Sequence, residues 1–68
     1  MNRMIDTAIL PDLNRIVYLV KKDRKGYNDW YELKPNACDS MFPENWFKQL
    51  CDDNKFFAWS YYPYGVSR

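Results

Sequence analysis

In two neighbouring segments of the chain, the order of apolar and polar residues is typical of β-strands. Residues 15–22 read RIVYLVKK, where β-branched and aromatic side chains point to both sides of an extended backbone. Residues 23–26 form a polar connection that ends in Gly26, and residues 27–34 return as a second extended run. Because glycine readily adopts the left-handed backbone that such a turn needs, the pattern predicts an antiparallel β-hairpin whose first strand is central.

A helical pattern begins at Pro43. One apolar stripe recurs at i, i+1, i+4 and i+5, at Trp46, Phe47, Leu50 and Cys51. Pro43 suits the first helical position, and Glu44 beside it complements the positive end of the helix dipole. Asn54 can end the helix in a left-handed conformation.

Two further elements complete the expected order. The pattern of residues 55–62 predicts a last strand, which ends at Pro63. Alternation along this strand predicts that Phe57 and Trp59 are buried beneath the helix. A short helical lead-in that ends before Pro11 is predicted from apolar residues at helical spacing, namely Met1, Met4, Ile5, Ala8 and Ile9.

The resulting fold class is α+β, with a three-stranded antiparallel or mixed sheet and one main helix packed on one face. A right-handed crossover through the helix would lay the third strand parallel to the second and beside the first, in the order 2-1-3. The 68 residues make a single domain, 1–68. Since one helix covers one face, apolar side chains on the other face must meet the N-terminal segment, a second copy or a target.

Aromatic residues are more abundant than so small a core needs, at 19% of the chain. We predict that an anchor patch for another protein is formed by Trp30, Tyr31, Phe56, Tyr61, Tyr62 and Tyr64. The alternative is purely structural. In that case the rings cover the back of the sheet together with Met4, Ile5 and Ile9.

Charge gives the second functional hypothesis. The net charge of +1 argues against a protein that binds nucleic acid mainly by charge. A basic cluster nevertheless lies at the hairpin tip, formed by Lys21, Lys22, Arg24 and Lys25. This cluster could neutralise phosphates, or it could only keep an exposed turn soluble, because nearby acidic residues dilute it.

The chain has little equipment for catalysis or for holding a metal. The chain has no histidine, so neither Cys38 nor Cys51 has an imidazole base that could activate it as a nucleophile. Two cysteines without histidine also cannot supply the four Cys or His ligands of a zinc site. We expect no cofactor, no metal and no enzymatic activity. The chain shows neither a secretory signal nor an apolar run near the ~18 residues of a membrane span, so we expect cytoplasmic localisation and free thiols rather than a disulfide.

The segment from Asp29 to Lys34 resembles the Asp and Glu-x-Lys motif of metal-dependent nucleases, in which two carboxylates hold Mg²⁺ near a lysine. In that family the Asp lies on a separate strand. Here strand alternation sends Asp29 to the face opposite Glu32 and Lys34. A solvated strand with a cross-strand ion pair is therefore the preferred interpretation.

The leading hypothesis is a non-enzymatic protein-binding module that acts through an aromatic sheet face or edge. In size and aromatic density the chain resembles, in style only, the small accessory proteins with which bacteriophages inhibit host machinery or defence. Pairing of the third strand with a second copy would close an exposed edge, which predicts a homodimer. The alternatives are nucleic-acid binding at the hairpin tip and a structural role in a larger assembly.

Overall fold

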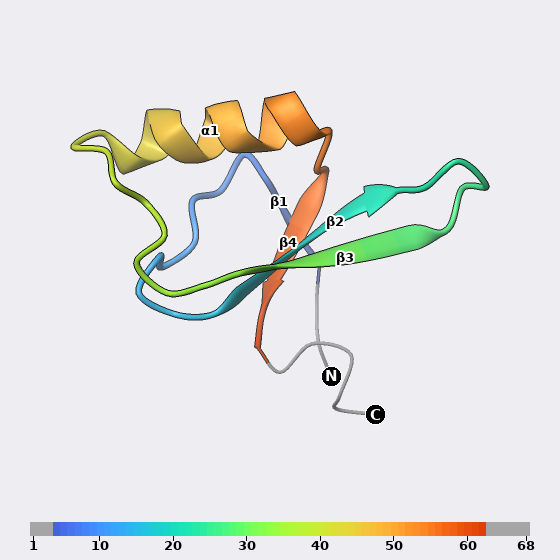
Figure 1. The fold of residues 1–68 in the computed structure, drawn as a ribbon, viewed down its shortest axis with the longest axis horizontal. Coiled ribbons are helices and arrows are strands. Elements are labelled where there is room, and N and C mark those ends of the chain that lie inside the picture. The colour runs from blue at the N-terminus through green and yellow to red at the C-terminus, as the bar shows by residue number, and fades with distance from the viewer. Residues whose placement is uncertain (1–3, 63–68) are drawn as a thin grey trace.

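The computed structural model describes residues 4–62, which form one helix and four strands (Figure 1). In chain order the elements are β1 (Ile5–Asp6), β2 (Val17–Lys22), β3 (Asn28–Leu33), α1 (Pro43–Asn54) and β4 (Ala58–Tyr61). Helix α1 lies along one side of the sheet. The α+β class predicted from the sequence is confirmed.

The sheet differs in detail from the three strands predicted in the order 2-1-3. It has four strands in the order β1-β4-β2-β3, and all neighbours are antiparallel. The additional strand is β1, where Ile5 and Asp6 pair with Trp59 and Ala58.

The N-terminal segment was expected to be a helical turn, and within the described residues this prediction is wrong. The Asp6 carboxylate accepts a 2.8 Å hydrogen bond from the backbone N–H of Ala8. The Asp6 carbonyl accepts another, of 3.0 Å, from the N–H of Ile9. An aspartate that binds nearby backbone in this way favours a turn over a helix, and apolar spacing alone does not reveal that competition.

The β2–β3 hairpin is confirmed, and its turn is built on Asp23. The Asp23 carboxylate accepts hydrogen bonds of 2.8 Å and 2.9 Å from the N–H groups of Lys25 and Tyr27. Gly26 has a φ of 89°, the left-handed backbone for which glycine suits this position. Figure 1 shows the hairpin tip and the loop that leads into α1 at opposite ends of the molecule.

Helix α1 begins at Pro43, as predicted, and ends one residue later than expected. The left-handed residue is Lys55, with φ 61° and ψ 32°, and not Asn54. Asn54 remains helical, and its side-chain amide donates a 2.9 Å hydrogen bond to the backbone carbonyl of Leu50. The left-handed Lys55 lets the backbone N–H of Phe56 donate a 3.0 Å hydrogen bond to the carbonyl of Cys51, which caps the end of the helix.

The core lies between α1 and the sheet. It contains five buried residues, Val17, Leu19, Phe47, Cys51 and Trp59. Burial of Trp59 is thus confirmed, but burial of Phe57 is wrong, because its side chain is 38% exposed. Phe56 packs against the core instead. Strand β4 begins only at Ala58, so the alternation expected from residue 55 onward does not apply to these two phenylalanines.

The face of the sheet opposite α1 also has a buried centre. In β2 the side chain of Val20 points away from the core cluster, and its partners across the sheet are Trp30 and Ala58. Val20, Ala58 and Ser60 are all buried. The helix-free face is therefore not a bare apolar surface.

Candidate protein-binding surface

The aromatic residues predicted as one anchor patch are divided between the two faces of the sheet. Strand register places Tyr31 and Tyr61 on the helix side, where Phe56 also packs against the core. Trp30 and Tyr62 belong to the opposite side, and Tyr64 lies outside the described residues. These side chains do not form one continuous surface.

On the helix side, the aromatic rings have neighbours within the chain. The ring centroids of Tyr31 and Phe56 are 5.6 Å apart, and the Lys21 ammonium lies 5.0 Å from the Tyr31 centroid. The Tyr31 hydroxyl donates a 2.9 Å hydrogen bond to the Asp29 carboxylate. That bond, followed by desolvation, raises the pKa of the Tyr31 hydroxyl. These contacts hold the Tyr31 ring in place, although 41% of the residue remains exposed.

Tyr61 is fixed in a similar way. The guanidinium carbon of Arg15 lies 3.7 Å from the Tyr61 ring centroid, which is a close cation–π contact. The Tyr61 hydroxyl accepts a 2.8 Å hydrogen bond from the backbone N–H of Asp12. Both contacts serve the fold and leave little of this ring for a partner.

On the helix-free side, two rings remain substantially exposed. Tyr62 is 50% exposed and lies 6.1 Å, centroid to centroid, from Tyr18. Phe57 is also exposed, and the Lys22 ammonium lies 5.6 Å from its ring centroid. Desolvation raises the pKa of the Tyr18 hydroxyl, with smaller contributions from Glu32 and Tyr62. Tyr62 and Phe57 are thus the available aromatic surface of this face.

The edge expected to mediate a homodimer is already partly paired. Strand β1 occupies the outer edge of β4 at Ala58 and Trp59. The open edge on which that expectation rested is therefore closed at these two residues. Homodimerisation stays a prediction.

A more exposed apolar surface lies at the start of α1, and the sequence reasoning missed it. Met41 is 89% exposed, Phe42 is 66% exposed, and Leu10 of the N-terminal segment lies beside them. We call these three residues the apolar corner. With Pro43, Glu44 and Asn45 they line a shallow hollow of about 300 Å³.

Local hydrogen bonds hold the backbone that presents this corner. The N–H of Phe42 donates a 3.0 Å hydrogen bond to the Ser40 hydroxyl, and the Phe42 carbonyl accepts one of 3.0 Å from Trp46. Pro43 restricts the preceding residue to extended backbone, and Phe42 has φ −121° and ψ 76°. The corner is therefore exposed on a fixed turn.

The local sequence around this corner favours burial of Met41, not its exposure. An apolar residue just before a helix N-cap usually packs on the fourth helical residue, here Met41 on Trp46. Such a contact would have hidden Met41. Its high exposure means that the expected contact leaves most of the Met41 side chain uncovered.

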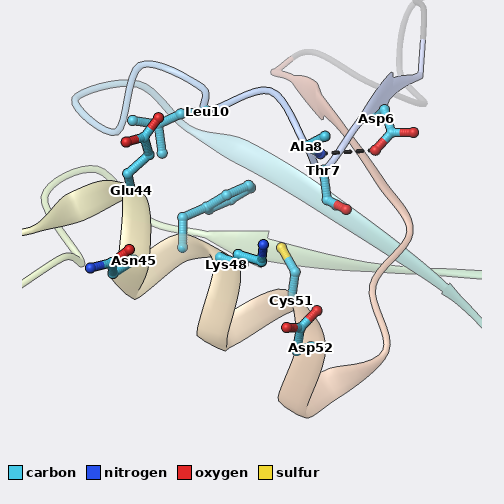
Figure 2. A pocket seen from close by; sticks show the side chains of 10 residues that line it. Asp6, Thr7, Ala8, Leu10, Glu44, Asn45, Lys48, Cys51 and Asp52 are labelled. Carbon is cyan, nitrogen blue, oxygen red and sulfur yellow. Dashed lines mark hydrogen bonds between the residues drawn. The ribbon is translucent and has the colours of Figure 1, made fainter.

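A larger hollow of about 450 Å³ lies between residues 6–10 and α1 (Figure 2). Leu10, Glu44 and Asn45 line both hollows, so the two are adjacent. The buried side chains of Phe47 and Cys51 form part of the lining of the larger hollow. Its charged lining residues are Asp6, Glu44, Lys48 and Asp52.

The basic residues at the hairpin tip do not share one face. Lys21 lies over Tyr31 on the helix side, whereas Lys22 lies over Phe57 on the other side. Lys22 also donates a 2.8 Å hydrogen bond to the side-chain carbonyl of Asn28. Arg24 and Lys25 are exposed in the turn itself. The tip therefore spreads its positive charge over several directions.

The groups considered for chemistry lie apart. Asp29 and Glu32 point to opposite faces of β3, as alternation predicts. Among residues 4–62 no three His, Cys, Asp or Glu side chains gather as metal ligands would. Cys38 and Cys51 are free thiols, and burial, aided by the charge of Asp52, raises the pKa of the Cys51 thiol to about 11. A thiol with so high a pKa is a poor nucleophile at neutral pH.

Comparison with known proteins adds no relative. The chain matches no protein-family model, and neither a curated protein nor a solved structure matches it. In the part of the chain that the structure describes, no helix has the length and apolar character needed to cross a membrane.

Proposed function

We propose that this chain is a non-enzymatic protein-binding module that docks on its partner through the apolar corner of Leu10, Met41 and Phe42. The observation that carries the proposal is the high exposure of Met41 and Phe42 on a backbone fixed by Ser40 and Pro43. Isolated exposed apolar residues are ordinary, but a contiguous group beside a hollow is typical of an interaction site.

The corner has the properties of an interface centre. Full burial of a Phe or Met side chain contributes about 1.5–3 kcal/mol, and aromatic residues and Met are enriched in interfaces. Because the turn is already ordered, little conformational entropy is lost on binding. These features favour the corner over Tyr62 and Phe57, which lie against the sheet.

A small domain with one such corner can occupy a surface of a larger protein and block it. This mode of action agrees with an inhibitor of the kind that bacteriophages direct at host machinery or defence. The aromatic helix-free face remains a second surface through which the same module could bridge two proteins.

Affinity capture from a bacterial lysate with paired variants tests the proposal. Met41→Ser combined with Phe42→Ser should lose the partner that the wild-type chain retains. The matched control is Tyr27→Ser, which removes a side chain of similar exposure, 68%, next to the hairpin turn. Retention of the partner by the double variant, with loss in Tyr62→Ala plus Phe57→Ala, would move the site to the helix-free face and overturn the proposal.

A further inference from the structure

We propose that the outer edge of β3 pairs with the same edge of a second copy of this chain, which joins two four-stranded sheets into one antiparallel sheet. This pairing does not depend on the proposed docking of the apolar corner. Strand β3 is terminal in the order β1-β4-β2-β3, and within residues 4–62 no strand lies on its outer side. The other terminal strand, β1, has only two residues, whereas β3 has six. The edge of β3 is therefore the longer open edge of the described sheet.

Hydrogen bonds of the hairpin fix which backbone groups of β3 face outward. The Asp23 N–H donates a 2.9 Å hydrogen bond to the Tyr27 carbonyl, and these two residues continue the register that pairs Lys22 with Asn28. Because backbone groups alternate in direction along a strand, the N–H and C=O groups of Asn28 and Glu32 point away from β2. Both residues are exposed. An antiparallel neighbour can therefore exchange backbone hydrogen bonds with both.

The charges along β3 select one register for this self-pairing. Two copies related by a two-fold axis place one residue of the strand opposite itself, and the central residues 29–32 are the positions that keep most of the strand paired. An axis at Asp29 or at Glu32 brings two like charges together, which is destabilising. An axis at Tyr31 places Asp29 opposite Leu33, an apolar side chain that packs against the core. An axis at Trp30 avoids all of these contacts.

The same register makes the polar side chains of the two copies complementary. It places Asn28 opposite Glu32 of the second copy, and the two-fold axis repeats this pair. Within one chain, Nζ of Lys22 donates a 2.8 Å hydrogen bond to Oδ1 of Asn28, which leaves the Asn28 amide N–H groups as donors. The Glu32 carboxylate has no hydrogen bond or ion pair within residues 4–62. Since Cβ atoms of opposite residues lie about 4.5–5.5 Å apart, the amide can donate to that carboxylate.

Dimerisation through β3 would give one assembly two apolar corners. A target with two suitable sites would then be held more tightly, because the second contact forms within an existing complex. Pairing of two six-residue strands covers a small area, so we expect a dimer in equilibrium with the monomer rather than a permanent one.

Sedimentation velocity over a series of concentrations tests the pairing. The wild-type chain should pass from monomer to dimer as its concentration rises to about 1 mM. Asn28→Glu places a second carboxylate opposite Glu32 of the other copy, so we expect the dimer dissociation constant to rise about three- to thirtyfold. The matched control, Asn14→Glu, changes the net charge equally but precedes β2 and lies outside both hairpin strands. It should stay within about twofold of wild type.

A rescue variant separates the specific pairing from a general disturbance of the edge. Combining Asn28→Glu with Glu32→Asn exchanges the two groups and again places one amide opposite one carboxylate. We expect this variant to dimerise nearly as well as wild type, and circular dichroism confirms that each variant is folded. A chain that stays monomeric at every concentration, a dimer unaffected by Asn28→Glu, or a double variant as weak as the single one would each overturn the proposal.

The apolar corner is a rival site for self-association. Met41→Ser combined with Phe42→Ser should leave dimerisation unchanged, because neither residue belongs to β3. Loss of the dimer in this variant, with retention in Asn28→Glu, would move the interface to the corner and overturn the pairing of β3.

Discussion

The indole N–H of Trp59 donates a 2.7 Å hydrogen bond to the backbone carbonyl oxygen of Ile9, which lies 50 residues earlier in the chain. Nearby, the Tyr61 hydroxyl accepts a 2.8 Å hydrogen bond from the backbone N–H of Asp12. Leu10, which lines both hollows beside α1, lies between these two attachment points. Strand β4 therefore holds residues 9–12 in place as well as contributing Trp59 to the core.

Replacing Trp59 with Phe tests this attachment. The change removes the hydrogen bond to Ile9 and leaves a void beside α1, so we expect the free energy of unfolding to fall by about 2–3 kcal/mol. Urea denaturation followed by circular dichroism measures the loss, which should appear as a lower midpoint with an unchanged slope.

Trp46→Phe is the control for that measurement. Trp46 packs against the core from α1 but is only partly buried, and its side chain makes no such bond to the described part of the N-terminal segment, residues 4–12. We expect a smaller loss of stability from this variant. An equal loss in both variants would show that ring volume alone matters and that the link to Ile9 contributes nothing measurable.

The sequence was informative wherever local chemistry decides the structure. The turn around Asp23 and Gly26 and the helix start at Pro43 depend on neighbouring residues, and both were predicted. Burial of Trp59 followed from strand alternation within β4. In these places the local preference and the final fold agree.

The sequence was less informative where contacts between distant residues determine the structure. Strand β1 is two residues long and exists because Ile5 and Asp6 pair with β4, more than fifty positions later. The exposure of Phe57 depends on where the chain resumes strand geometry after the left-handed Lys55. The apolar corner was missed for a related reason, since no local pattern states whether Met41 packs on the helix or remains in solvent.

Lys55 offers a prediction about stability. It is a non-glycine residue with φ 61° at the end of α1, a backbone conformation that is strained for most side chains and unstrained for glycine. Lys55→Gly should therefore stabilise the protein by about 0.5–1 kcal/mol, seen as a higher urea midpoint. Lys48→Gly, in the middle of the same helix, should instead destabilise it by about 1 kcal/mol. A loss of stability in Lys55→Gly would contradict the left-handed assignment.

The buried Cys51 thiol should make the stability of the protein depend on pH. Burial raises the pKa of its thiol from 9.0 to about 11 in the folded chain. Between these values the unfolded thiol loses its proton while the folded thiol keeps it, so unfolding is favoured and stability falls as pH rises from about 9 to 11. Below pH 9 both states are protonated and the contribution is constant. The fall should be steeper in wild type than in Cys51→Ala, in which this thiol is absent, when urea midpoints are compared across that range. Parallel curves would show that the Cys51 thiol ionises equally in both states.

The arrangement of charges at the hairpin tip predicts that any binding of nucleic acid is weak and depends only slightly on salt concentration. Lys21 and Lys22 lie over rings on opposite faces, so Arg24 and Lys25 are the cations best placed to meet one backbone together. For duplex DNA each neutralised phosphate contributes about −0.9 to the slope of log K against log salt, which gives about −1.8 for two contacts and about −3.6 for four. We expect the shallower value from a salt titration, with Arg24→Ala plus Lys25→Ala abolishing binding and Lys21→Ala plus Lys22→Ala reducing it only slightly. A slope near the steeper value, with equal losses in both pairs, would favour nucleic-acid recognition at the tip over the protein-binding role.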